Sequence, residues 1–401
     1  MSAAAAPEAM WPPGGFAVYV HVPFCVRRCT YCDFPIVVGM DGDARSRYMD
    51  AVVAEWRREA LPPGPITSVY FGGGTPSLAE PRDIGRVLEA LAARAWVPSG
   101  TEVTLEANPG TMTASHLADY RQVGVNRVSL GVQAAQAHHL RRLHREHDVA
   151  EAHRAVRQLR RARFDNLSVD AIYGLPDQTL AEWHETIRCL TSWAPDHVSL
   201  YALQVEEGTP LARSVGRGTS TLPGEDLVGD MADLAETSLP AMGYRRYELS
   251  NFSRPGRESR HNRAYWRHHP YIGVGAGAHS FSGPTGARRW WNGRHVRAYM
   301  TEALSGRDPT AGEERLSMAQ LAGEAVWLGL RETAGVSLSA FRERFGVELE
   351  QAFPGVLGPL EAAHLLRRTP ETILLTRRGM AVGNQVFTRF LTAVLPSAVD
   401  P

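Results

Sequence analysis

The chain has 401 residues, enough to bury a large core and to form one large domain with one or two smaller ones. Lys plus Arg and Asp plus Glu both total 43, so the net charge is zero and gives no general attraction to nucleic acid or anionic lipid. Four cysteines make no disulfide framework at this length, and no window approaches the roughly 18 consecutive apolar residues of a membrane span, so we expect a soluble, cytoplasmic protein in which peripheral membrane contact stays possible.

Residues 1–15 are rich in Ala and Pro and carry neither the basic nor the apolar region of a signal peptide, so we expect a flexible N-terminal tail. The apolar run Phe16 to Val22 predicts a strand that stops at Pro23. A loop follows that carries three cysteines in C-x3-C-x2-C spacing, namely Cys25, Cys29 and Cys32.

Three thiolates on one loop suit an iron–sulfur cluster, a zinc ion or no metal at all. A structural zinc site is closed by four ligands, and no second cysteine pair is present. A cubane cluster held by three cysteines keeps one iron open to a small molecule, so we favour the cluster. We expect Arg27 and Arg28 to lower the pKa of the thiols.

Strand and helix patterns then alternate as far as residue 205. The strands predicted after the first cover residues 66–71, 102–107, 127–132, 166–173 and 196–204. Helical patterns lie between them, the last opening with the capping box Thr179-x-x-Glu182. Six such units predict an α/β fold in which residues 16–205 form a partial (βα)6 TIM-like barrel, with its ligand site at the carboxyl ends of the strands.

Glycines and polar side chains fall at those predicted ends. Gly72-Gly-Gly-Thr-Pro76 follows the second strand, and it is no phosphate loop because no Lys follows it. A glycine-rich turn is also simply a tight turn, but glycines let backbone amides approach a ligand closely. Four polar residues lie at or beyond the ends of the third, fourth and fifth strands: Glu106, Gln133, Arg145 and Asp170. Their shared position predicts one site.

The pattern changes after the sixth strand. Residues 206–312 are expected to extend the barrel with a helix near 227–239, a strand over 244–249 and a loop-rich segment over 251–293 that contains His261-Asn-Arg-Ala-Tyr-Trp266. Residues 313–401 predict three helices, a hairpin over 365–378 and one closing helix to about residue 391. Helices followed by a hairpin indicate a mostly helical, winged-helix-like module.

The cysteine loop after a first barrel strand resembles the signature of the radical S-adenosylmethionine (radical SAM) superfamily. The stretches Tyr19-Val-His-Val-Pro-Phe-Cys25 and Cys32-Asp-Phe34 are similar to the subgroup of oxygen-independent coproporphyrinogen III oxidase and the HemW-type haem chaperones. His261-Asn-Arg-Ala-Tyr-Trp266 resembles the H-N-x-x-Y-W motif of the chaperones. The oxidase has a further cysteine where this chain has Phe34, and a long N-terminal arm where this chain has a short tail.

The resemblance implies three cofactors or ligands. Cys25, Cys29 and Cys32 would hold a 4Fe-4S cluster. S-adenosylmethionine (SAM) would be bound by Tyr19, Gly73, Gly74, Thr75, Glu106, Gln133, Arg145 and Asp170. His261 is the first candidate for a haem contact, ahead of His268, His269 and His279, while Cys189 is expected to be a spare thiol.

The resemblance also implies a function, namely haem binding and delivery to acceptor haemoproteins such as respiratory enzymes. The first alternative is the oxidase, which would turn two propionates into vinyl groups with a radical. The second is a regulator that binds nucleic acid and senses iron or haem through the cluster, for which the C-terminal module would supply Arg367, Arg368, Arg377 and Arg378. Because the net charge is zero, we expect no nucleic-acid partner.

Overall fold

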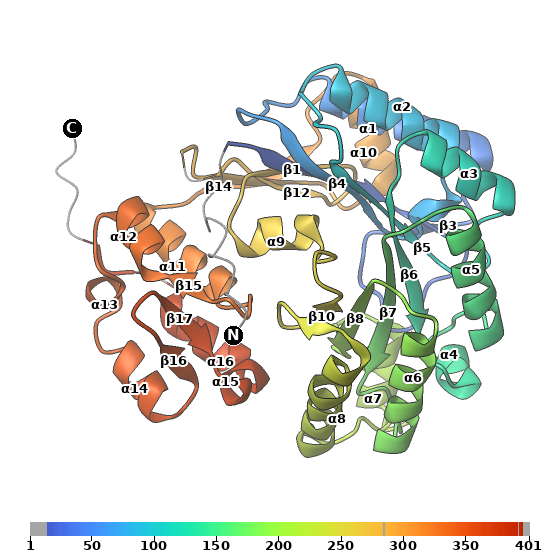
Figure 1. Ribbon diagram of the computed structural model, residues 1–401. Helices are drawn as coiled ribbons and strands as arrows, with labels where there is room; N and C mark the ends of the chain where they lie inside the picture. The colour runs from blue at the N-terminus through green and yellow to red at the C-terminus, as the bar shows by residue number, and fades with distance from the viewer. Residues whose placement is uncertain (1–13, 284, 392, 396–401) are drawn as a thin grey trace.

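The structure is a computed structural model, and it describes residues 14–283, 285–391 and 393–395. A curved sheet with helices on its outer side fills most of the molecule, and a smaller, mainly helical module lies beside it (Figure 1). Apart from Gly14 and Gly15, the predicted N-terminal tail lies outside the described residues.

Six consecutive strand–helix units form the central part of the sheet, as predicted. The strands are β1 (Phe16–Val22), β4 (Ile66–Gly73), β5 (Glu102–Ala107), β6 (Arg127–Gln133), β7 (Leu167–Tyr173) and β8 (His197–Ala202). The helices between them are α1 (Gly42–Trp56), α2 (Pro81–Ala92), α3 (Ala114–Gln122), α4 (Ala137–Arg142), α5 (Val149–Arg161) and α6 (Leu180–Ser192). Each strand pairs in parallel with the next, so the partial (βα)6 barrel is confirmed.

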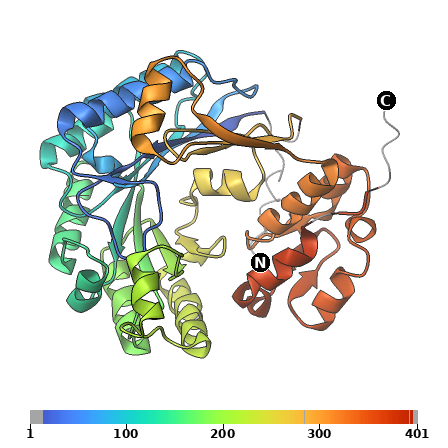
Figure 2. The ribbon, with the colours of Figure 1, turned by 180° about the vertical axis from the view of Figure 1, so that it is seen from behind.

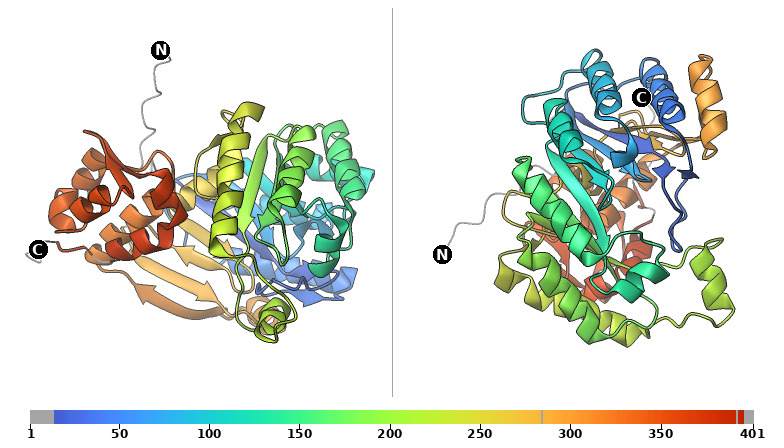
Figure 3. Two further views of the ribbon diagram at one scale, coloured as in Figure 1. Left: turned by 90° about the horizontal axis from the view of Figure 1, so that it is seen from below. Right: turned by 90° about the vertical axis from the view of Figure 1, so that its right-hand side faces the viewer.

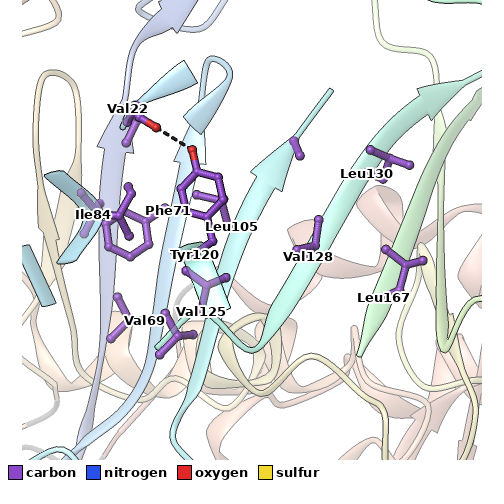
Figure 4. Close-up of a cluster of buried hydrophobic side chains, with 14 of the residues drawn as sticks. Val22, Val69, Phe71, Ile84, Leu105, Tyr120, Val125, Val128, Leu130 and Leu167 are labelled. Carbon is purple, nitrogen blue, oxygen red and sulfur yellow. Dashed lines mark hydrogen bonds between the residues drawn. The ribbon is translucent and has the colours of Figure 1, made fainter. Parts of the chain in front are cut away.

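The two faces of these strands differ in chemistry because side chains alternate along a strand. Residues such as Val69, Leu105 and Val128 point outward and pack against the helices, where Ile84 of α2 and Tyr120 of α3 meet them (Figure 4). The intervening positions are polar and buried, among them Ser68, Thr104, Arg127, Ser129 and Ser168. The inner side of the barrel is therefore a polar surface enclosed by an apolar shell.

The sheet continues beyond β1. Strand β11 (Tyr271–Val274) pairs in parallel with β1, and β12 (His279–Phe281), β13 (Arg288–Asn292) and β14 (Thr310–Arg315) follow in antiparallel order. Helix α10 (Val296–Leu304) lies against α1 (Figure 2). At the opposite edge, β10 (Asn251–Ser253) and β9 (Arg245–Arg246) pair next to β8 and complete a sheet of 12 strands.

The prediction of a loop-rich segment over residues 251–293 is therefore wrong. This segment contains β10, α9 (Arg260–Trp266), β11, β12 and β13. Strands of three to five residues are too short to show a clear alternation. They form on the edges of the barrel sheet, where β11 pairs with β1, β12 and β13 follow β11, and β10 pairs with β8. Helix α9 lies within the open side of the barrel (Figure 1).

Helices α7 (Pro210–Gly216) and α8 (Glu225–Ser238) join β8 to the edge strands, and α8 is the helix predicted there. The C-terminal module contains α11 (Met318–Gly329), α12 (Leu338–Phe345), α13 (Leu349–Ala352) and α14 (Leu357–Ala362). The predicted hairpin is β16 (Leu366–Arg368) with β17 (Thr372–Leu375), and β15 (Val336–Ser337) pairs on its other side. The module lies to one side of the barrel (Figure 3).

Two features of the C-terminal part differ from the predictions. The module is expected to begin at residue 313, but this position lies inside β14. The buried hydrophobic cluster of the module contains Phe281 of β12 and otherwise begins at Leu316. The single closing helix is instead α15 (Arg377–Ala381), α16 (Gly383–Phe387) and the 3-10 turn η3 (Thr388–Phe390). The helix is interrupted at Val382, whose φ of −115° is not helical. Within the part of the chain that the structure describes, no helix combines the length and apolar character needed to cross a membrane.

Candidate metal-cluster and cofactor site

The three cysteines lie together at the carboxyl end of β1. Cys25 belongs to β2 (Phe24–Cys25), which pairs with β3 (Val37–Val38), and the Cys32 N–H donates to the Cys29 carbonyl at 3.4 Å. All three are free, partly exposed thiols, and Cys29 and Cys32 are close enough to raise the pKa of Cys25. Three convergent cysteine sulfurs, with no fourth cysteine beside them among the described residues, fit a 4Fe-4S cluster that keeps one iron open.

The predicted lowering of the thiol pKa values by Arg27 and Arg28 is outweighed by burial, and of the two arginines only Arg28 contributes to it, at Cys32. Burial raises the pKa of Cys25 to about 11 and also raises that of Cys32, for which the attraction of Arg28 is a smaller effect. Arg27 is 60% exposed and lies 3.8 Å from Glu146. The raised pKa values keep Cys25 and Cys32 protonated in the free protein at neutral pH, so metal binding has to release these protons.

Arg145 brings a buried cation to the cysteine loop. Its Nη1 donates to Cys29 Sγ at 3.6 Å, and its Nη2 donates to the Gly131 carbonyl at 2.6 Å and to Asn108 Oδ1. The cation suits the negative charge of a thiolate-bound cluster. Asn108 was not among the predicted site residues, although it stands two positions after Glu106 in the same turn.

The glycine-rich loop is bound to the chain just before the cysteines. The Gly74 N–H donates to the Val22 carbonyl at 2.9 Å, and the Thr75 N–H donates to the Phe24 carbonyl at 2.6 Å. Gly73 has a φ of +113°, and a Cβ there would lie 2.4 Å from the His21 ring. These two N–H groups donate within the chain, so contact of the loop with the SAM amino group, which stays a prediction, would use other atoms of Gly73, Gly74 and Thr75.

A hydroxyl of the same loop faces the cysteines. Thr75 Oγ1 accepts a hydrogen bond from Asn108 Nδ2 at 2.9 Å and lies 3.8 Å from Cys25 Sγ. Asn108 thus connects the glycine loop to Arg145, because its side chain contacts both. The loop, the cysteines and Arg145 form one connected cluster.

Glu106 lies one residue before the end of β5 and contacts the glycine-rich loop. Its Oε1 accepts from the Tyr70 hydroxyl at 2.7 Å, and its Oε2 accepts from the Gly73 N–H at 3.0 Å. Tyr19 lies beside Tyr70 with ring centroids 6.2 Å apart, and its hydroxyl is 3.1 Å from His21 Nδ1. Burial, aided by Asp170, raises the pKa of Glu106 to about 7.

Gln133 and Asp170 come from the neighbouring strands. Gln133 ends β6 with a left-handed φ of +73°, and the strand shifts register there. Asp170 does not lie at a strand end, because β7 continues to Tyr173; alternation turns its side chain into the barrel. There it accepts hydrogen bonds from Ser129 Oγ at 2.8 Å and from Ser168 Oγ at 3.1 Å. Burial raises its pKa.

His261 lies inside the barrel, on α9. Its side chain stacks on Tyr70 with ring centroids 4.9 Å apart, and its residue is 1% exposed. Nδ1 is 3.0 Å from Ser68 Oγ, and Nε2 is 2.9 Å from the Tyr265 hydroxyl. Burial lowers its pKa to about 3. Because Ser68 and Tyr265 already contact both ring nitrogens, a haem iron would have to displace one of these two partners.

The other histidines of this segment lie apart from that position. His268 stacks on Phe281 with centroids 4.5 Å apart and places Nε2 3.1 Å from Glu324. His279 stacks on Trp291, and His269 is partly buried. The structure does not gather these four histidines into one site. Cys189 is a partly buried free thiol on α6.

Two family models match the chain, the radical SAM superfamily over residues 19–190 and the HemN C-terminal domain over residues 316–382. The chain is 34% identical to the heme chaperone HemW of Lactococcus lactis over 94% of its own length and 97% of that protein. It is 32% identical to the heme chaperone HemW of Bacillus subtilis, covering 94% and 99%.

The chain is also 37% identical to the mitochondrial radical S-adenosyl methionine domain-containing protein 1 of Bos taurus, over 80% of this chain and 74% of that protein. Coproporphyrinogen III oxidase (HemN) of Escherichia coli, a radical SAM enzyme, has the same fold, with a TM-score of 0.81 at 21% identity over 96% of this chain and 92% of that one. The chain belongs to the HemW family of the radical SAM superfamily.

Proposed function

We propose that the protein is a haem chaperone, which binds haem and transfers it to acceptor haemoproteins such as respiratory enzymes. The observation that carries this proposal is the similarity over nearly the whole chain to proteins named heme chaperone HemW, 97% and 99% of whose lengths are covered. The oxidase shares the fold, but likeness at 21% identity carries no activity with it.

The proposal includes a 4Fe-4S cluster on Cys25, Cys29 and Cys32, with SAM at the mouth of the barrel. A reduced cluster of this kind supplies one electron for breaking a carbon–sulfur bond of the sulfonium. The residues of this chain would position that chemistry. Arg145 offsets negative charge beside Cys29, and the carboxyl of Glu106 is placed to accept from an ammonium or hydroxyl group.

A cavity of about 690 Å³ between the segment after the cysteines and α10 suits haem in size and chemistry. Met40, Met300 and Leu304 supply apolar surface, and a methionine sulfur is a known axial ligand of haem iron. Arg47 and Arg297 are exposed at the wall and form no ion pair with any other residue in the described ranges, so they are free to bind two propionates. Among the described residues that line the cavity, Asp41 is the acidic one, and its side chain caps α1.

We place the haem in this cavity rather than at His261, because both nitrogens of His261 already have partners. The cavity wall also lies next to the cluster loop, since Val38 of the wall pairs with Cys25. Haem binding there would be sensitive to the state of the cysteine loop without haem entering the barrel.

Ion pairs of the C-terminal arginines weaken the alternative that the module binds nucleic acid. Arg368 lies 2.8 Å from Glu350 and 3.0 Å from Glu361, and Arg377 lies 2.7 Å from Asp233. These ion pairs reduce the positive charge that the module offers to phosphates.

One anaerobic preparation decides between the chaperone and the oxidase. Haem titration followed by absorbance should give saturable binding of one haem per chain. The same preparation, supplied with SAM, a reductant and coproporphyrinogen III, should give no decarboxylated product by mass spectrometry. Multiple turnovers to that product would overturn the chaperone proposal.

A further inference from the structure

Two histidines and a glutamate meet at the rim of the barrel, away from the cysteines. His138 and His139 lie on α4 and Glu182 on α6, and one ligand atom from each falls within 4.8 Å of the others. His138 Nε2 is 3.2 Å from Glu182 Oε1, and His139 Nε2 is 3.5 Å from Glu182 Oε2. The imidazole centroids are 4.0 Å apart, so both rings approach the same carboxylate.

His139 is buried without a hydrogen-bond partner. Its side chain is 1% exposed, and neither ring nitrogen makes a hydrogen bond with protein atoms in the described part of the chain. A buried polar group left unpaired costs about 1–3 kcal/mol, and such groups in a folded protein call for an explanation. A bound cation would take up the lone pair of Nε2, which the 3.5 Å contact with Glu182 leaves without a well-formed hydrogen bond.

Glu182 is held in place before any ligand arrives. Its Oε2 accepts hydrogen bonds from the Thr179 N–H and hydroxyl, both at 2.9 Å, in the capping box of α6. These bonds use Oε2 and leave Oε1 facing His138. The cap therefore fixes the orientation of the Glu182 carboxylate, so this side chain loses little conformational entropy when a metal ion binds.

The two helices are also tied to each other. Gln136, the residue before α4, donates through Nε2 to the Glu182 carbonyl at 3.0 Å and to Glu185 Oε2 at 2.8 Å. The Thr186 hydroxyl donates back to Gln136 Oε1 at 3.1 Å. These bonds keep the start of α4 against the first turns of α6, where the three ligands lie.

We propose that His138, His139 and Glu182 bind a first-row divalent transition-metal cation of the Zn²⁺ class, with water in the fourth position. Two imidazoles and a carboxylate are a donor set that zinc uses. A tetrahedral ion spaces its ligands by roughly 3.3 Å, close to the 3.2 Å between His138 Nε2 and Glu182 Oε1, and one ligand atom of each of the three residues lies within 4.8 Å of the others. The positive charge of nearby Arg142 limits the affinity, and Glu185 offsets it in part. The ion would hold α4, which leads to Arg145, against α6.

The test uses the full chain with its cluster reconstituted, dialysed anaerobically against micromolar Zn²⁺ and analysed for zinc and iron in the same sample. We expect one zinc per chain beyond the cluster iron. His139→Phe and Glu182→Gln should each weaken zinc binding at least tenfold with iron unchanged, and glutamine at position 182 still suits the capping box. His138→Gln, at a half-exposed position, serves as a second variant if His139→Phe fails to fold.

The matched control is His116→Phe, because His116 lies 3.9 Å from Glu80 without a second histidine beside it. It should leave the zinc content unchanged. Co²⁺ bound to the Cys25→Ser, Cys29→Ser, Cys32→Ser variant should show weak visible bands without sulfur-to-metal charge transfer. Absence of the extra zinc, its persistence in His139→Phe and Glu182→Gln, or its loss on replacing the cysteines would overturn the proposal.

Discussion

Arg145 donates a hydrogen bond from Nη1 to Cys29 Sγ at 3.6 Å, across 116 positions of sequence. Its other terminal nitrogen bonds the Gly131 carbonyl, so the guanidinium is anchored to β6 while it contacts the cysteine loop. The contact joins the first and fourth strand–helix units of the barrel at the point where the proposed cluster lies. The positions of the cysteines thus depend on a residue of a distant unit.

Arg145→Lys should weaken cluster and SAM binding even though it keeps the charge. A lysine ammonium is a single point, and it cannot contact Cys29, Asn108 and Gly131 together as the planar guanidinium does. We expect about tenfold weaker SAM affinity in equilibrium binding, equivalent to about 1.4 kcal/mol, and a lower iron content after reconstitution. Arg142→Lys is the control, since that exposed side chain pairs with Asp177. Equal effects in the two variants would contradict the assigned role.

Gly73→Ala should lower the free energy of unfolding more than an alanine replacement at another glycine that also has a positive φ. The new Cβ would lie 2.4 Å from the His21 ring at a φ of +113°, so both backbone strain and a steric clash act there. Gly100→Ala is the matched control, because its φ is +82° and no atom lies within 4 Å of its Cβ. We expect a loss of about 1 kcal/mol of unfolding free energy in the control and at least twice that in Gly73→Ala. Chemical denaturation measures both, and equal losses would refute the clash.

The sequence predicted the parallel strand–helix units because each carries a long, regular pattern and the units repeat. It did not predict the segment over residues 251–293, where the three-residue strands β10 and β12 depend on pairing with β8 and β11, respectively. The cysteine loop could be recognised from spacing alone. The burial that raises the pKa of Cys25 could not, since it comes from residues far away in the chain.

The pH dependence of stability should report on Glu106. Its carboxyl has a pKa near 7 in the folded chain against an ordinary value of 4.5, because burial disfavours the charged form. A raised carboxyl pKa means that the unfolded chain ionises first, so this group lowers the free energy of unfolding as pH rises from about 4.5 to 7 and changes it no further above that. Glu106→Gln should remove this loss, which is at most about 3 kcal/mol.

Glu55 provides the control for Glu106. Burial also raises its pKa to about 7, but it lies on α1, bonded to the Gly275 N–H and the Tyr299 hydroxyl, outside the proposed SAM site. Glu55→Gln should flatten the same pH range of the unfolding free energy and leave SAM affinity unchanged, whereas Glu106→Gln should lower SAM affinity as well. SAM binding unaffected by Glu106→Gln would remove Glu106 from the cofactor site.

Haem binding distinguishes the proposed cavity from His261. The double variant Arg47→Gln, Arg297→Gln should lower haem affinity at least tenfold, because two charged contacts to propionates are lost. His261→Ala should leave the absorption spectrum of bound haem unchanged, since its ring is enclosed between Ser68 and Tyr265. A changed axial-ligand spectrum in His261→Ala, with normal affinity in the double variant, would return the haem to His261.

Site residues differed in how well sequence located them. Glu106 and Gln133 could be placed because each lies within one residue of a strand end. Asp170 is the fourth residue of β7 and not at its end, where the pattern predicts it, and no pattern in the sequence distinguishes Asn108 from an ordinary turn residue after Glu106. The contacts of both depend on strand length and register, which the pairing of the sheet determines and local sequence does not.

The central claim is that three cysteines hold a 4Fe-4S cluster at the mouth of this barrel. Iron content and visible absorption of anaerobically reconstituted protein test it most directly, with serine at positions 25, 29 and 32 and with Cys189→Ser as the control. We predict about four iron atoms per chain in the unaltered protein and in the control, and near-complete loss of iron and brown colour in each of the three single variants. Iron content and absorption that survive all three replacements would contradict the account.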